Sequence, residues 1–102
     1  TDFFDKMLSK VDPENLIGID TLLHFEIEGE NAGQYTIEIK DGKVDLKQGL
    51  LGEAVCSVKS TEKNLKALAN GELNPMMAVM TGKVKISNPM ELLKYAKILG
   101  LM

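Results

Sequence analysis

The chain has 102 residues, a length that suits one domain spanning residues 1–102, and its 44% apolar and 26% charged content is typical of a folded globular protein. Its formal net charge is −3, and all 12 of its basic residues are lysine. Because nucleic-acid-binding surfaces are basic and rich in arginine, which grips phosphate and guanine with two hydrogen bonds, we exclude nucleic acid as the expected partner.

Two short helical segments are predicted at the start of the chain. Residues 1–8 carry four large apolar side chains at spacings that share one helical face, namely Phe3, Phe4, Met7 and Leu8. Residues 12–14 (DPE) then supply a cap, a proline at the first helical position and an acidic first turn. This combination predicts a brief second turn of helix.

The apolar pattern changes to a period of two from Ile19 onward. Residues 19–28 and 34–40 each alternate apolar and polar side chains, and a loop at 29–33 separates them. Such alternation predicts two strands of a sheet that is apolar on one face and mostly polar on the other.

The dipeptide Asp41-Gly42 predicts a two-residue hairpin turn, in which glycine tolerates positive φ. The turn fixes the expected register of the next strand. Apolar residues then face apolar residues, and one like-charge pair arises that only nearby lysines would soften. The expected pairs are Lys40 with Lys43, Ile39 with Val44, Glu38 with Asp45, and Ile37 with Leu46.

Five further elements follow from local chemistry. A fourth strand, with Ala54, Cys56 and Val58 on one side, precedes a helix capped by Ser60 or Thr61. A second helix and the last helix each begin with Asn-Pro, a cap followed by a proline at the first position. The expected ranges are a strand at 54–59, a helix to about Ala69, a helix at 74–80, a strand at 83–86 and a helix from Asn88 to about Leu99.

This order predicts the fold class. A helix precedes a four-strand antiparallel run, and two helices, a strand and a final helix follow. Strands segregated from helices in this way indicate an α+β fold, a five-stranded, mainly antiparallel sheet that helices cover on one face.

Candidate catalytic residues are few. His24 shares the polar side of its strand with Glu26 and Glu28, a set that can bind metal or move protons, but a solvated face is the favoured interpretation. Cys56 lies on the apolar side of its strand without a partner base, which favours a buried structural thiol. We therefore predict no catalytic residue, no metal site, no cofactor and no enzyme activity.

The sequence also carries an expectation of location. A single cysteine allows no intrachain disulfide, and no apolar run approaches the ~20 residues of a membrane span. The N-terminal residues show no signal-peptide pattern, and the C-terminal GLM matches no peroxisomal or endoplasmic-reticulum address. We expect a cytoplasmic protein without stable membrane insertion.

The last helix and the segment before it carry an excess of flexible apolar side chains. Glu91, Lys94 and Lys97 form a single polar stripe on the last helix, and the rest of its circumference is apolar. Residues 76–80 add three methionines, which adapt to apolar partners of different shapes. Composition alone fits two interpretations, a core plus a dimer face, or a cavity between the sheet and the helices.

Four segments, taken in order, resemble the sterol carrier protein-2 family. They are 33–42 (GQYTIEIKDG), 55–60 (VCSVKS), 65–68 (LKAL) and 70–86 (NGELNPMMAVMTGKVKI). The last is the most specific, because it joins a helix ending at glycine, an Asn-Pro helix start and a Gly-Lys-hydrophobic-Lys-Ile strand. The likeness runs from about Ile19 to Leu99.

The resemblance implies a five-stranded sheet and an apolar tunnel that carries a fatty acid, acyl-CoA, isoprenoid or sterol-like lipid without any chemistry. Family members have a longer first helix, so the implied pocket here is smaller or more open. The resemblance also implies an alternative function, an accessory or dimerisation module such as those of isoprenoid-quinone synthesis. Such a module presents the apolar last helix to a protein partner or a second copy. The implied lipid-binding residues, chosen by facing, are Leu23, Phe25, Tyr35, Ile37, Met77, Met80, Met90, Leu93, Ala96 and Leu99.

Overall fold

The computed structural model of the chain describes residues 2–9, 11–29, 32–96 and 98. Every element predicted from the sequence is found, with small shifts at the ends. The helical segments are α1 (Asp2–Ser9), the 3-10 turn η1 (Pro13–Leu16), α2 (Glu62–Ala69), α3 (Pro75–Met80) and α4 (Pro89–Ala96). The strands are β1 (Thr21–Glu28), β2 (Gly33–Lys40), β3 (Lys43–Gln48), β4 (Cys56–Thr61) and β5 (Val84–Ile86).

The five strands form one mixed sheet in the order β3-β2-β1-β4-β5. The pairs β1–β2 and β2–β3 are antiparallel, as predicted, and β4–β5 is antiparallel as well, but β1–β4 is parallel. The expectation that the first four strands form one antiparallel run is therefore wrong for β4. The reason is that β3 already runs in the direction of β1, and the connection of residues 49–55 crosses the sheet before β4 begins.

The β2–β3 hairpin has the predicted register at every pair, including Glu38 opposite Asp45. Its turn residue Asp41 has a φ of 53° and Gly42 a φ of 74°, the left-handed values that this kind of turn requires. The Nζ of Lys47 lies 3.2 Å from Oε1 of Glu38 and so softens the like-charge pair. Local turn chemistry and the apolar pattern thus agree on one register.

Side-chain caps start the helices at the predicted positions. The Thr61 hydroxyl accepts a hydrogen bond from the amide of Asn64 at 3.2 Å, and α2 begins there. The Asn74 side chain accepts from the amides of Met76 and Met77 at 2.9 and 3.3 Å, and α3 begins there. These bonds satisfy amides that have no partner within the helix.

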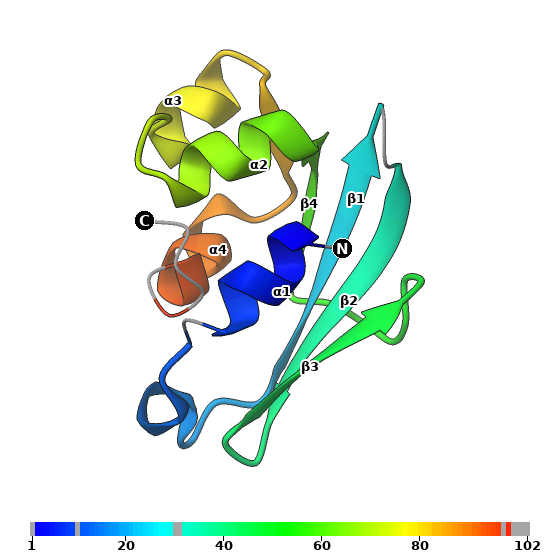
Figure 1. The fold of residues 1–102 in the computed structure, drawn as a ribbon, viewed down its shortest axis with the longest axis vertical. Helices are drawn as coiled ribbons and strands as arrows, with labels where there is room; N and C mark the ends of the chain where they lie inside the picture. Colours follow the sequence, from blue (N-terminus) through cyan, green and yellow to red (C-terminus); the bar gives the residue numbers. More distant parts are fainter. Residues whose placement is uncertain (1, 10, 30–31, 97, 99–102) are drawn as a thin grey trace.

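The molecule has two layers, because the helices lie together on one side of the sheet (Figure 1). We call the side they cover the inner face and the opposite side the outer face. Apolar residues of both layers form one core, which includes Phe4, Leu65 and Leu92 from the helices. None of the described helices is long and apolar enough to cross a membrane.

Candidate functional site

The inner face of the sheet is an apolar surface built by strand alternation. The residues that β1, β2 and β4 direct toward the helices are almost all buried, while their neighbours along each strand face outward. Four of these residues have side chains with no solvent-exposed area, namely Leu23, Phe25, Ile37 and Ile39. The central strands therefore offer a continuous wall that interacts through shape and apolar contact.

An aromatic cluster lies between this wall and α1. The ring of Phe4 packs edge-on against Phe25, with ring centroids 5.6 Å apart, and lies 4.9 Å from the ring of Tyr35. Gly33 makes room for Tyr35, because a Cβ on Gly33 would lie 2.9 Å from the tyrosine hydroxyl oxygen. Phe4 is itself buried, so α1 covers this part of the inner face.

A hollow opens at the edge of the same layer, between η1 and the β2–β3 hairpin. Its volume is about 350 Å³, and its apolar lining residues include Leu8, Val11, Leu16 and Val44. All four belong to the core or pack against it. Lys43 and Asp45 lie at the same hollow and supply its charged groups. The hollow therefore joins solvent to the apolar layer.

The four strand residues of the predicted lipid site lie together on the inner face. Leu23, Phe25 and Ile37 are fully buried, and Tyr35 is half-buried beside them. The register places Phe25 opposite Tyr35 and Leu23 opposite Ile37, so the four form two neighbouring cross-strand pairs. Their contact with a ligand stays a prediction.

The helical residues of the predicted site are not brought to this wall. Met77 and Met80 of α3 are 53% and 77% exposed, and Met90 of α4 is 70% exposed. The inward positions are instead Ala78 and Leu92, both buried. Successive helical residues are separated by about 100°, so a helix that turns residue 78 or 92 inward directs Met80 or Met90, two positions away, to solvent. Met77, one position from Ala78, lies at the side of α3 and is less exposed than Met80.

The remaining members of the predicted site are Leu93, Ala96 and Leu99. Leu93 is half-buried, and Tyr95 and Ile98, which the prediction omitted, pack against the core. Ala96 is the last residue of α4. Its side chain and all of Leu99 lie outside the described part of the structure.

His24 lies on the outer face, where its Nε2 is 2.9 Å from the backbone carbonyl oxygen of Leu51. Because a carbonyl oxygen only accepts, Nε2 carries the hydrogen of this bond. The described residues contain no group of three or more His, Cys, Asp or Glu side chains arranged to hold a metal ion. The hydrogen bond from His24 to Leu51 holds the connection of residues 49–55 against the outer face of the sheet.

Cys56 lies on the inner face and is buried, as the sequence predicted. Burial raises the pKa of the Cys56 thiol, and this effect outweighs hydrogen bonds from the Asn88 backbone and the Ser87 side chain, which lower it. The thiol is held in its neutral, weakly nucleophilic form.

The fold and this site define a class of protein, a small α+β domain whose helices cover the apolar face of a five-stranded mixed sheet. The model of the SCP-2 sterol transfer family matches residues 4–99. The chain therefore belongs to that family, as the resemblance implied.

Three similar proteins place the domain in context. Hydroxysteroid dehydrogenase-like protein 2 of Xenopus tropicalis is 32% identical over 101 residues, which are 97% of this chain and 24% of that protein. The sec-alkylsulfatase Pisa1 from Pseudomonas sp. superposes with a TM-score of 0.82 and 25% identity over 98% of this chain and 16% of its own. Sterol carrier protein domain 2 of Helicoverpa armigera superposes with a TM-score of 0.72 and 26% identity, over 97% of this chain and 80% of its own. The chain thus spans about a quarter of the curated relatives that it matches.

Proposed function

We propose that the domain binds a lipid, without chemistry, between the inner face of the sheet and the helices. The observation that carries this proposal is the hollow beside η1, whose apolar lining packs directly against the core. Its volume of about 350 Å³ lies within the range of about 300–1,000 Å³ that is typical of small-molecule sites. The family membership and the sterol carrier domain among its structural neighbours support the same class of ligand.

The ligand enters with its apolar chain first and leaves its polar end at the rim. Leu8 and Val44 form the sides of the entrance. Lys43 and Asp45 both lie at this hollow, and Lys43 is the group that can pair with a carboxylate or phosphate head group. This orientation suits a fatty acid, an acyl-CoA or an isoprenoid with an anionic end, and a sterol-like lipid fits the apolar part alone.

Deeper insertion displaces Phe4. Its ring occupies the space over Phe25 and Tyr35, so a long chain that follows the wall of β1 and β2 exchanges with that ring. Each buried methylene contributes about 0.8 kcal/mol, and loss of the Phe4 contacts and of translational freedom offsets part of this gain. We expect micromolar affinity and broad selectivity, because an apolar wall distinguishes one methylene by only about 1–3 kcal/mol.

The test combines native mass spectrometry with displacement of a fluorescent fatty acid. The protein as purified is expected to carry a discrete added mass that solvent extraction removes and identifies. A bare mass, together with no binding of the fluorescent fatty acid at tens of micromolar, would overturn the proposed function.

A pair of variants tests the entrance. Val44→Trp fills the hollow and is expected to weaken fatty-acid binding at least tenfold. The matched control is Val55→Trp, a change at a residue that is 43% exposed in the connection between β3 and β4. Equal binding by both variants, with lipid still bound, would show that the entrance lies elsewhere.

We infer a second candidate function, a module that docks α4 against a partner. Two observations favour it, namely the exposure of Met90 on α4 and the small fraction of the curated relatives that the chain spans. In those relatives the matched region is one part of a longer chain. Sedimentation that depends on concentration, and that Met90→Glu abolishes, supports this function, whereas a monomer at all concentrations contradicts self-association.

A further inference from the structure

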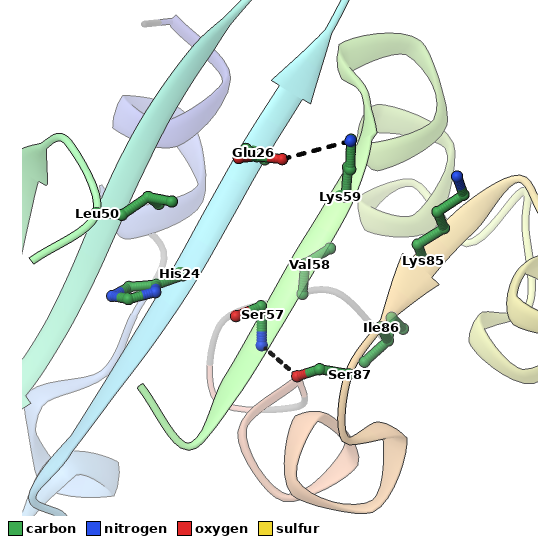
Figure 2. Close-up of a pocket in the computed structure, with 9 residues that line it drawn as sticks. All are labelled: His24, Glu26, Leu50, Ser57, Val58, Lys59, Lys85, Ile86 and Ser87. Carbon is green, nitrogen blue, oxygen red and sulfur yellow. Dashed lines mark hydrogen bonds and ion pairs between the residues drawn. The ribbon is translucent and has the colours of Figure 1, made fainter. Parts of the chain in front are cut away.

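A hollow on the outer face of the sheet is a separate candidate site. It lies over β1, β4 and β5, has a volume of about 350 Å³, and is shown in Figure 2. The helices lie on the opposite side of the sheet, so this hollow shares no space with the proposed lipid site. Sequence reasoning missed it, because its residues meet only through the parallel β1–β4 pairing and the β4–β5 pairing, both of which join segments that are distant in sequence.

One cross-strand row brings two lysines together in this hollow. The register places Glu26 beside Lys59 and Lys59 beside Lys85. The two lysines are exposed neighbours of like charge, an arrangement that is unfavourable without a counter-charge. Backbone pairing keeps their Cα atoms side by side, and each charged Nζ lies at the end of a flexible side chain.

Glu26 does not neutralise this pair. Its Oε1 accepts a hydrogen bond from the Gln34 amide nitrogen at 2.8 Å, and its Oε2 lies 3.7 Å from Nζ of Lys59. Lys85 has no ion-pair partner among the described residues, and Figure 2 shows its side chain on the opposite side of Lys59 from Glu26. The row therefore has a net charge of +1, concentrated toward β5.

The next row of the hollow adds a hydroxyl group. Ser57 is exposed, and its amide donates to the Ser87 hydroxyl oxygen at 2.8 Å while the Ser87 amide donates to the Ser57 carbonyl oxygen at 2.9 Å. These two bonds fix the strand edge. The Ser57 hydroxyl, which has no hydrogen bond within the described structure, lines the same hollow (Figure 2).

Apolar side chains border the polar groups. Leu50 is 41% exposed on one side of the hollow. Ile86, at the opposite border, pairs with the inward-facing Val58 and packs against the core. Leu50 keeps this place because the adjoining Leu51 amide donates to the Thr36 hydroxyl at 2.8 Å and the Leu51 carbonyl bonds to His24. The hollow thus combines two neighbouring cationic side chains, a hydroxyl donor and an apolar border at Leu50.

We propose that this outer-face hollow binds the phosphate group of a phosphate monoester that carries an apolar substituent. The dianion lies between Lys85 and Lys59 and relieves their repulsion, with the Ser57 hydroxyl as a further donor. The substituent lies against the exposed side chain of Leu50. A phosphate dianion fits better than a carboxylate, because it can engage two cations and a hydroxyl with separate oxygens.

The experiment titrates the isotope-labelled protein with inorganic phosphate and with phenyl phosphate at constant ionic strength, and follows the backbone amide signals by NMR. We expect saturable shifts at residues 57–59 and 85–87, with phenyl phosphate binding at least threefold more tightly than inorganic phosphate. Lys85→Gln is expected to weaken the binding of phenyl phosphate at least fivefold.

The matched control is Lys40→Gln. Lys40 also faces a lysine across two strands, Lys43, and its loss changes the net charge equally, but it lies at the hairpin turn outside the outer-face hollow. We expect its affinity for phenyl phosphate to stay within twofold of the unmodified chain. Equal weakening by both variants, or shifts spread over all lysines, would overturn the site.

A second experiment, with lipid vesicles, identifies whether the phosphate belongs to a lipid head group or to a soluble ester. Phosphatidylcholine vesicles with and without phosphatidic acid are compared by co-sedimentation. Binding that requires phosphatidic acid and is lost in Lys85→Gln assigns a lipid head group, whereas phenyl phosphate binding without vesicle binding assigns a soluble ester. The absence of both overturns the proposal, and because fatty-acid displacement is measured separately, the proposed lipid function is unaffected.

Discussion

Along β1, adjacent residues belong to two surfaces with opposite properties. Leu23 and Phe25 face the helices without any exposed area, whereas His24 and Glu26 face outward and interact with a backbone carbonyl, an amide and a lysine. The inner face is constrained by packing against α1, α2 and α4. The outer face is constrained by cross-strand pairing, which fixes which residues are neighbours but does not require their side chains to be apolar. The two proposed binding sites therefore lie on opposite faces of one sheet.

The largest expected difference between the faces is in stability. Phe25→Ala removes a fully buried ring that contacts Phe4, so we expect the free energy of unfolding to fall by about 3–5 kcal/mol. Its neighbour Glu26→Ala removes a partly exposed ion pair and is expected to cost less than about 1 kcal/mol. Urea unfolding followed by circular dichroism measures both. Equal losses would mean that the outer face is as tightly constrained as the inner one.

The connection that lies on the outer face is tested by Gly52→Ala. Gly52 has a φ of +66°, and an added Cβ would lie 2.8 Å from Cδ1 of Leu22, so we expect a loss of about 2 kcal/mol. Gly71 has a similar φ of +77°, and a Cβ added there would meet nothing within 4 Å. Gly71→Ala therefore measures the cost of the backbone conformation alone, which we expect to be about 1 kcal/mol of unfolding free energy. Leu22→Ala is expected to remove the difference, and its persistence in that background would refute the steric cause.

Thiol reactivity distinguishes the faces chemically. The raised pKa of Cys56 leaves less thiolate at any given pH, so iodoacetamide is expected to alkylate the folded protein at pH 8 at least about tenfold more slowly than the unfolded chain. The rate is expected to rise with pH as the thiol ionises. A Cys56→Ala/Ser57→Cys double variant moves the thiol to the exposed outer face and is expected to react rapidly. Rapid alkylation of Cys56 itself, measured by mass spectrometry, would contradict its burial.

The smallest effect concerns the edge of the sheet. Lys47→Ala removes the 3.2 Å pair with Glu38, which partly offsets the repulsion between Glu38 and Asp45. Because Lys47 is half-exposed, we expect a loss of only about 0.5 kcal/mol in low salt and less than that in about 1 M NaCl, where charges are screened. A loss that does not depend on salt would indicate packing rather than charge.

Local chemistry made most of the fold predictable. The Asp41-Gly42 turn, the Asn74 cap and the alternation along β1 each act within a few residues, so the sequence predicts the elements and one hairpin register. The parallel placement of β4 was not predictable in this way, since it depends on the crossing of residues 49–55. The same limit applies to the outer-face hollow, whose lysines come from two different strands.

The candidate lipid site was predictable only on the strands. Alternation assigns Phe25 and Tyr35 to one face, but α3 and α4 are apolar around most of their circumference, so their inward side cannot be read from periodicity. The structure resolves this by turning Ala78 and Leu92 inward and leaving Met80 and Met90 outward. The position of Phe4 over the wall depends on how α1 docks, which is a tertiary contact.

The pairing of β1 also bears on how the chain folds. The β2–β3 hairpin joins residues that are close in sequence, and hairpins of this kind form in about 1–10 μs. The β1–β4 ladder joins residues more than 30 positions apart, as in Leu23 with Cys56, so its formation must first overcome the entropy of closing that loop. We therefore expect folding to begin at the β2–β3 edge of the sheet. Formation of the β1–β4 ladder, which completes the inner wall and the floor of the outer-face hollow, is expected to set the folding rate.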